Sequence, residues 1–209
     1  MLVDLQQKII ASIEKEVTGR IGWEEYFLKQ AILISERSTC TRVQVGVVLT
    51  NKNNKVLATG YNGVPRGQVH CKDYFFKYFV NQVLNKQFPY YIDTMHFNLE
   101  EVREAVYGKR YIDMYKDWLT TDEFRQLHGL FSAEREIHAE QNAFAGVARD
   151  ELEDGKMFCT LSPCSGCSKM IVATGVKEFY YLEKYDRDDG SKAINFLKQN
   201  SVKIQQVKI

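Results

Sequence analysis

The sequence predicts a three-layer α/β fold with a mixed sheet of about five strands, an N-terminal helix and a helical insertion. Two observations support this fold class. From residue 136 onward, helical and strand patterns alternate along the chain, as they do in βαβ units. Upstream, two β-branched runs flank the turn residues 51–54, which is typical of a β-hairpin. The 209 residues suit one domain, so we expect 1–209 to form a single domain.

Two helices are expected before the hairpin. Residues 2–17 carry apolar side chains at three- and four-residue spacings, which predicts an amphipathic helix and makes residues 1–20 an N-terminal appendage. Gly19 and Gly22 interrupt this pattern. A second helix is expected from about Trp23 to Glu36.

The hairpin strands are expected at residues 43–50 and 55–61, followed by a glycine-rich loop over 60–67. Residues 72–135 are rich in Tyr and Phe and have helical periodicity, so we interpret them as a helical insertion. The elements expected beyond it are helix 138–149, strand 156–161, helix 165–174, strand 176–182, helix 190–199 and strand 202–207.

Composition excludes several classes of protein. The 44% hydrophobic content allows a sizeable core and excludes a disordered chain. A net charge of +1 argues against a polynucleotide-binding surface. No apolar run is long enough for a membrane span, which takes about 20 residues, and the N-terminus lacks the order of a signal peptide. We therefore expect a cytoplasmic protein without a membrane partner, in the host cytoplasm if the chain is viral.

The five cysteines are more consistent with metal binding or burial than with disulfides. Their number is odd, and cytosolic thiols stay reduced. Cys159 is expected to be a small apolar residue on the interior of a strand.

The strongest chemical signal is His138-Ala139-Glu140 followed by Pro163-Cys164-Ser165-Gly166-Cys167. This H-x-E and P-C-x-x-C pattern is the signature of zinc nucleobase deaminases. One imidazole and two thiolates leave the fourth position of a tetrahedral zinc open, as catalytic sites require. Both cysteines are expected at a helix start, where the helix dipole favours a thiolate.

Glu140 lies two residues after His138 and is not needed as a ligand. Water bound to such a zinc has a pKa near 7, so Glu140 is placed to take its proton and pass it to the base and the leaving ammonia. Taken alone, Cys164-x-x-Cys167 also fits a redox pair or half of a zinc knuckle, and a lone histidine also fits a core position. The combined order favours the catalytic site.

Over about 23–67 and 136–205, the chain resembles deoxycytidylate (dCMP) deaminases of the phage and bacterial type, within the cytidine deaminase superfamily. The zinc motif identifies the superfamily. A glycine loop and an Arg-Ser-x-Cys run point to deoxycytidylate. The segments that carry the resemblance are Trp23–Phe27, Ser35–Cys40, Val45–Val48, Thr59–Gly67, Glu136–Ala143 and Thr160–Cys164.

The resemblance implies a cytidine-deaminase-like fold and hydrolysis of dCMP to dUMP, the dTMP precursor. It implies that Asn62 contacts the sugar hydroxyl, although a turn residue is the plainer interpretation. Ser162 and its neighbours, with Ala139, would line the base pocket. Asn142 would support that pocket, and Tyr185 would lie near the substrate or serve ordinary packing.

The substrate phosphate needs a cation or backbone amides. Arg37 and Arg42 flank the first strand and are the candidates. Each also fits an ordinary solvated arginine.

Some phage members of this family carry a second, structural zinc. The ligands available here are Cys40, His70, Cys71 and His128, a closed set of two thiolates and two imidazoles. His70 and Cys71 are adjacent, so a water or His96 is an alternative fourth ligand. The simpler interpretation is a set of unrelated buried residues.

The family is commonly a hexamer, activated by dCTP and inhibited by dTTP, with Mg²⁺ expected on these effectors. The resemblance places allosteric or subunit-contact roles at Gly60, Tyr61, Gly63 and Arg149. The long insertion departs from compact members, and its aromatic residues fit either an oligomer interface or a core of their own.

Three functions remain open from the sequence. A polynucleotide deaminase is disfavoured by the near-neutral charge. A non-catalytic zinc-binding relative is disfavoured by the presence of Glu140, because a pure binder needs no proton shuttle. Within the preferred function, dCTP and free deoxycytidine remain alternative substrates, because the size of the phosphate pocket selects among them and a sequence does not show that size.

Overall fold

The computed structural model describes residues 19–84, 108–185 and 188–209, and these form two compact units. The first, which we call the sheet unit, takes its described residues from 19–38, 45–62, 138–185 and 188–209. The second, the helical unit, takes them from 39–44, 63–84 and 108–137. The expected helix 2–17 and His96 lie outside the described residues.

The sheet unit has five strands in the order β2-β1-β3-β4-β5, which confirms the predicted mixed sheet. β1 pairs antiparallel with both β2 and β3, whereas β3, β4 and β5 run parallel. Their bounds are Gly46–Thr50, Val56–Tyr61, Lys156–Leu161, Glu178–Glu183 and Lys203–Gln206. The parallel strands all have their carboxyl ends at one edge of the sheet.

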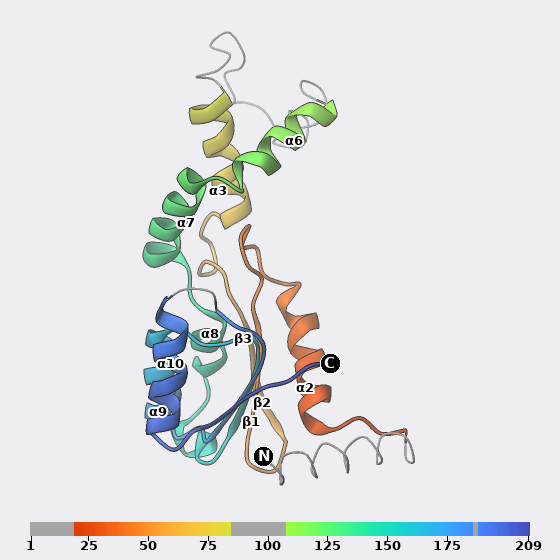
Figure 1. The fold of residues 1–209 in the computed structure, drawn as a ribbon, viewed down its shortest axis with the longest axis vertical. Coiled ribbons are helices and arrows are strands. Elements are labelled where there is room, and N and C mark those ends of the chain that lie inside the picture. The colour runs from red at the N-terminus through yellow and green to blue at the C-terminus, as the bar shows by residue number, and fades with distance from the viewer. Residues whose placement is uncertain (1–18, 85–107, 186–187) are drawn as a thin grey trace. The chain divides into compact units, whose positions relative to one another are not determined.

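Helices cover both faces of this sheet, which confirms the three layers (Figure 1). α2 (Trp23–Ser35) packs Phe27, Leu28 and Ala31 against one face. The other face is covered by α8 (Ala139–Phe144), α9 (Ser165–Ala173) and α10 (Asp188–Gln199). β1 is buried along its whole length because it lies between these layers.

Two predicted elements are shorter in the structure. The strand expected at 43–50 begins at Gly46. The helix expected at 138–149 ends at Phe144, because Ala145 is extended and Gly146 has a φ of 98°, outside helical geometry. The short 3₁₀ helix η3 (Arg149–Leu152) follows. The other predicted elements after residue 136 match within about two residues.

The described part of the helical unit contains α3 (Cys71–Tyr78), the π-helix η1 (Phe79–Leu84), α6 (Gly108–Trp118) and α7 (Asp122–Arg135). The helical character predicted for 72–135 is confirmed there. The aromatic residues build a core of this unit, with Phe75 in ring contact with Trp118, Phe124 and Phe131. Thr121 caps α7 by accepting a hydrogen bond from the Phe124 N–H at 3.2 Å.

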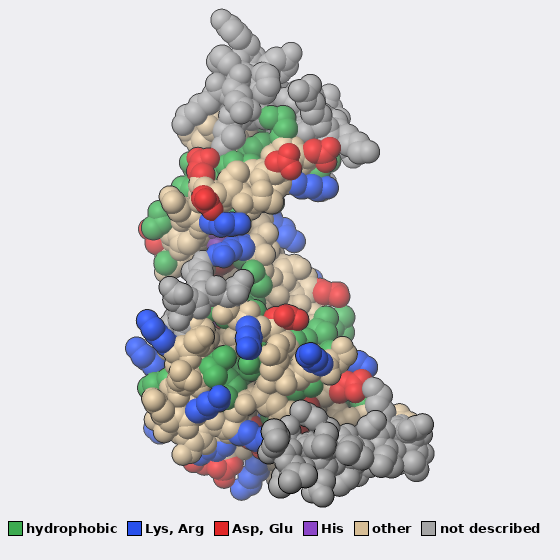
Figure 2. All heavy atoms as spheres, viewed as in Figure 1, with side chains coloured by type: hydrophobic (Ala, Val, Ile, Leu, Met, Phe, Trp, Pro, Cys, Tyr) green, Lys and Arg blue, Asp and Glu red, His purple; other side chains and the backbone are tan. Residues whose placement is uncertain are grey.

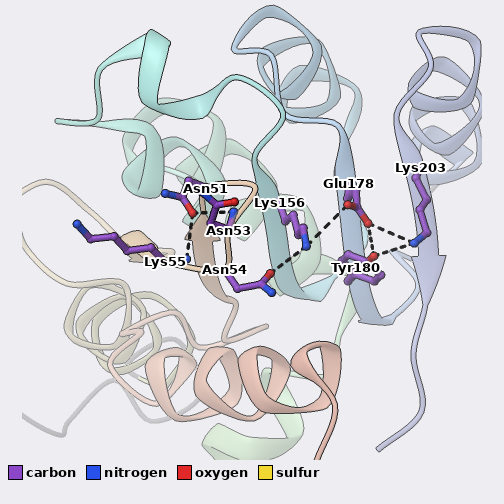
Figure 3. Close-up of polar contacts among 8 residues, drawn as sticks. All are labelled: Asn51, Asn53, Asn54, Lys55, Lys156, Glu178, Tyr180 and Lys203. Atoms are coloured by element: carbon purple, nitrogen blue, oxygen red, sulfur yellow. Dashed lines mark hydrogen bonds and ion pairs between the residues drawn. The ribbon is translucent and has the colours of Figure 1, made fainter. Parts of the chain in front are cut away.

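A polar network joins the amino ends of the parallel strands in the sheet unit (Figure 3). Glu178 on β4 accepts from the Tyr180 hydroxyl and from Lys203 on β5 at 3.2 Å. Lys156 on β3 lies 3.9 Å from Glu178 and donates to Asn54, in the β1–β2 turn, at 2.9 Å. The network therefore links three strands and the hairpin turn.

Charged side chains of both signs are spread over the surface in view in Figure 2, with uncharged side chains and backbone between them. This arrangement is that of an ordinary solvated surface. Within the described ranges, no helix combines the length and apolar character that crossing a bilayer requires.

Candidate active site and metal centres

Three of the predicted ligands meet in the sheet unit. The ligand atoms of His138, Cys164 and Cys167 all lie within 4.8 Å of one another. His138 Nδ1 is 3.5 Å from Cys164 Sγ and 3.4 Å from Cys167 Sγ. A tetrahedral zinc, with bonds of about 2.3 Å to sulfur and 2.0–2.1 Å to nitrogen, separates such ligands by roughly 3.5 Å. The three residues therefore fit zinc.

Two helix starts hold these ligands. His138 is the residue before α8, and Cys164 is the residue before α9. The Gln141 side chain accepts the His138 N–H at 2.9 Å and so fixes the first turn of α8. At α9, the Cys167 N–H points at Cys164 Sγ, 3.5 Å away. Backbone donors at a helix start favour the thiolate that a metal requires.

The electrostatics of the two thiols agree with a thiolate site. The Cys164 sulfur accepts a hydrogen bond from the Cys167 thiol, which lowers the pKa of Cys164 to about 4 against the opposing effect of burial. The same bond raises the pKa of Cys167, the proton donor. Nearby His138 adds to the stabilisation of the Cys164 thiolate.

Glu140 lies inside the protein beside these ligands. It sits in the first turn of α8 and is only 5% exposed. Burial raises the pKa of its carboxyl group, and the Cys164 charge acts in the same direction. A buried carboxyl group beside these ligands is placed to take up and deliver a proton.

A second cluster of ligand atoms lies in the helical unit. Cys40, Cys71, His128 and Glu136 place their ligand atoms within 4.8 Å of one another. Cys40 Sγ is 3.2 Å from His128 Nε2 and 4.0 Å from Glu136 Oε2. No hydrogen-bond partner for the buried Glu136 Oε1 lies among the described residues. A buried carboxylate oxygen needs a cation or a donor, so these four residues also fit a zinc ion.

The fourth member of this cluster differs from the expected one. His70 is exposed, and its Nδ1 lies 3.2 Å from Thr39 Oγ1, outside the group. His70 is the residue before α3 and Cys71 is its first residue, so the two neighbours point differently. Glu136 takes the expected place of His70. Its only sequence signal was its position at the end of α7, two residues before His138.

A hydrogen bond links the two thiols of this cluster. The Cys71 thiol donates to Cys40, which lowers the pKa of Cys40 to about 3, and His128 contributes in the same direction. Burial raises the pKa of Glu136, and the negative charge of Cys40 raises it further.

The expected substrate residues lie at strand and helix ends. Asn62 follows β2, and its side-chain oxygen accepts the Val45 N–H at 2.8 Å. Ala139 is buried in α8, and Ser162 is 3% exposed just after β3. Tyr185 follows β4, and its N–H donates to Ser162 Oγ at 2.8 Å.

The two candidate phosphate ligands, Arg37 and Arg42, are both exposed. Arg37 follows α2 in the sheet unit, whereas Arg42 belongs to the helical unit. Their side chains are accessible to an anion, and their use by the substrate stays a prediction.

The residues expected in regulation also have structural contacts. Gly60 is buried against α8, and the Tyr61 carbonyl accepts from Asn142 Nδ2 at 2.7 Å. Gly63 forms an antiparallel bridge with Ile137 inside the helical unit. Arg149 begins η3 and is exposed. Cys159 is fully buried on β3, where burial raises the pKa of its thiol.

Known proteins resemble this chain over most of its length. Residues 21–183 match the model of the cytidine and deoxycytidylate deaminase zinc-binding region. The deoxycytidylate deaminase of Enterobacteria phage T4 is 34% identical over 163 residues, which cover 77% of this chain and 78% of that protein. The deoxycytidylate deaminase of Saccharomyces cerevisiae is 28% identical over 207 residues, 98% of this chain and 51% of that protein.

A solved structure agrees with these relatives. The dCMP deaminase of cyanophage S-TIM5, crystallised with dCMP and dUMP, superposes with a TM-score of 0.53 at 26% identity. The match covers 88% of this chain and 95% of that one. Taken with the zinc-ligand geometry, the family model and the phage relative show that the chain belongs to the cytidine and deoxycytidylate deaminase family.

Proposed function

We propose that this chain hydrolyses dCMP to dUMP and ammonia and so supplies the precursor of dTMP. The observation that carries the proposal is the buried Glu140 beside three residues that fit a zinc ion, in a chain 34% identical to a phage deoxycytidylate deaminase. The S-TIM5 enzyme, whose structure was determined with dCMP and dUMP, supports the same substrate.

In this proposal His138, Cys164 and Cys167 hold the catalytic zinc. When bound, the metal supplies a Lewis acid that lowers the pKa of water toward neutrality. Glu140 would take a proton from the attacking water and deliver it to the ring nitrogen. Water oxygen bonds to the amino-bearing carbon, and the carbon–nitrogen bond then breaks. The attacking oxygen gives its second proton to Glu140 as it becomes the uracil carbonyl oxygen, and Glu140 passes this proton to the departing amino group, which leaves as ammonia.

The strand ends supply the substrate contacts in this proposal. Asn62 binds the sugar hydroxyl, since the bond from Val45 fixes its side-chain oxygen and thereby the orientation of the amide. Ala139 and Ser162 line the base pocket, and Tyr185 lies near the nucleotide. Arg37 and Arg42 are each a candidate cation for the phosphate, because a dianion requires cationic partners.

We further propose a structural zinc at Cys40, Cys71, His128 and Glu136. Four ligand atoms within 4.8 Å of one another, and a buried carboxylate oxygen, support it. These residues come from the segment before β1, from α3, from α7 and from the residue after α7. A metal there would tie together the parts of the helical unit.

Regulation follows the family pattern in this proposal. The enzyme is a hexamer that dCTP activates and dTTP inhibits, with Mg²⁺ on the nucleotide triphosphates. Gly60 and Tyr61 at the end of β2, and Gly63 beyond it, take part in regulation, and the exposed Arg149 lies at a subunit contact.

The test is a deamination assay on zinc-loaded protein with dCMP, with and without dCTP, following cytosine absorbance and ammonia. Glu140→Gln should lose activity by roughly 10²–10⁴-fold, the usual contribution of a general acid–base group, while keeping its zinc. Glu151→Gln, an exposed carboxylate in η3, is the matched control. Absence of dCMP turnover by zinc-replete wild type, with and without dCTP, would contradict the proposal. Parallel assays with dCTP and deoxycytidine then define the substrate.

A further inference from the structure

We propose that the hydroxyl group of Ser162 is a positioning group that holds the Tyr185 backbone and releases the Ser162 carbonyl oxygen from the sheet. The inference rests on the proposed deaminase function. It assigns to the side chain a role separate from that of the backbone groups expected to line the pocket.

The hydrogen bonds at the end of the sheet carry this inference. β3 and β4 pair in parallel up to Leu161 and Glu183, and the Ser162 N–H then donates to the Glu183 carbonyl at 2.8 Å. In a regular parallel ladder, the Tyr185 N–H would next donate to the Ser162 carbonyl. Here the Tyr185 N–H donates to Ser162 Oγ at 2.8 Å. The hydroxyl has therefore replaced the carbonyl as the acceptor.

The change of acceptor occurs where β3 ends. The paired residues of β3 and β4 end at Leu161 and Glu183, and Pro163 directly follows Ser162. The chain must turn there to place Cys164 at the start of α9. Ser162 is 3% exposed, so its buried hydroxyl forms its hydrogen bond with another protein group and not with solvent.

This change of acceptor matters because of where the Ser162 carbonyl lies. Ser162 is two residues before Cys164, in the segment that leads to the metal ligands. A carbonyl oxygen without its ladder donor can accept a hydrogen bond from a ligand. The proposed substrate brings an amino group to this region, so a released acceptor suits it.

Tyr185 is also confined by α10. A Cβ built on Gly190 would lie 2.5 Å from the Tyr185 carbonyl oxygen and 3.4 Å from Tyr185 Cβ, so only glycine leaves room at that position. The Tyr185 N–H is thus held by the end of β3 while its carbonyl lies against α10. Two elements fix the backbone of a residue that the proposed function places near the nucleotide.

Ser162→Ala tests the role of the hydroxyl. Without it, the Tyr185 N–H should return to the carbonyl of residue 162, which the substrate then loses as an acceptor. We expect kcat/KM for dCMP to fall roughly tenfold, the equivalent of one hydrogen bond, at unchanged zinc content. Ser162→Thr keeps a hydroxyl and should restore most of the loss. Thr174→Ala removes a hydroxyl at the far end of α9 and serves as the matched control.

Amide hydrogen exchange at Tyr185 gives a readout that does not depend on activity. Its rate should rise in Ser162→Ala and return toward the wild-type rate in Ser162→Thr. Wild-type kcat/KM in Ser162→Ala would overturn the proposal, and so would equal losses in both variants with unchanged Tyr185 exchange. If the wild type itself does not deaminate dCMP, the proposed function fails, whereas the exchange rates still report on the hydroxyl–amide bond.

Discussion

Gly60 on β2 lies directly against the backbone of Ala139 in α8. A Cβ built on Gly60 would be 2.2 Å from the Ala139 carbonyl oxygen and 2.6 Å from the Ala143 nitrogen. Both are backbone atoms, so neither moves aside without displacing the helix. Because α8 begins directly after His138 and contains Glu140, a glycine on β2 limits the position of the helix that carries the proposed catalytic residue.

Gly60→Ala should therefore destabilise the protein and weaken its catalytic metal site. Overpacking of this kind costs about 1–3 kcal/mol, and the displaced α8 should also lower zinc affinity. Thermal unfolding and zinc titration measure the two effects. Gly129→Ala is the control, since a Cβ there meets nothing within 4 Å and alanine favours the helix. Unchanged stability and zinc affinity in Gly60→Ala would show that the contact is not restrictive.

The fourth ligand of the second cluster should be Glu136 and not His70. Glu136→Ala should lower the affinity for a second zinc by at least roughly 10–100-fold, the loss found when even an outer partner of a metal site is removed. His70→Ala should leave two zinc ions per chain, because His70 is exposed and outside the group. Metal analysis after mild chelation distinguishes the two variants. Loss of the second zinc in His70→Ala alone would reverse the assignment.

The contrast between His70 and Glu136 shows which parts of the site follow from sequence. The positions of His138, Cys164 and Cys167 were predictable because each lies at a helix start that the neighbouring residues indicate. Local spacing therefore fixes the directions of these three side chains. The second cluster joins residues separated by up to 96 positions. Its membership depends on how α3 and α7 pack, and spacing does not encode that packing. Cysteines and a histidine attract attention as ligands, whereas a glutamate after a helix does not.

The fold follows a similar division. The alternation after residue 136 predicted the parallel strands, because buried parallel strands and their covering helices have clear apolar patterns. The end of α8 at Phe144 was missed because the apolar pattern continues through Val147 while the backbone leaves helical geometry at Ala145 and Gly146. The Ser162–Tyr185 bond was not predictable, since it depends on the register of β3 against β4.

The cap of α7 should contribute measurable stability to the helical unit. Thr121→Ala removes the acceptor of the Phe124 N–H and should cost about 1 kcal/mol. Thr121→Ser keeps the acceptor and should cost less than half of that. Urea unfolding in a Trp23→Phe background gives the measurement, because Trp118 is then the chain's one tryptophan and lies in the core of this unit. Equal midpoints for the alanine and serine variants would argue against the cap.

The network at the amino ends of the strands should make the stability of the protein depend on pH in the acidic range (Figure 3). Burial alone would raise the pKa of Glu178, but the Tyr180 hydroxyl and the Lys203 ammonium outweigh it and the pKa is lowered. A carboxyl group whose folded pKa lies below its unfolded value stabilises the protein above the unfolded pKa. That contribution is lost as pH falls through the folded pKa.

Glu178→Gln should therefore unfold at lower temperature than the wild type at pH 7, by an amount equivalent to about 1 kcal/mol after allowance for solvent screening. The difference should shrink as pH falls below about 4, where the wild-type carboxyl group also becomes neutral. Melting temperatures from pH 7 to pH 3 measure this convergence.

Lys29→Gln is the control. It removes one partner of the exposed Glu25–Lys29 pair on α2 and should change stability by only about 0.3–0.5 kcal/mol. Parallel melting curves for wild type and Glu178→Gln across this pH range would mean that the Glu178 charge does not stabilise the fold. Convergence would instead identify the link between β4 and β5 as one that acid weakens, because Glu178 is the carboxylate that Tyr180 and Lys203 share.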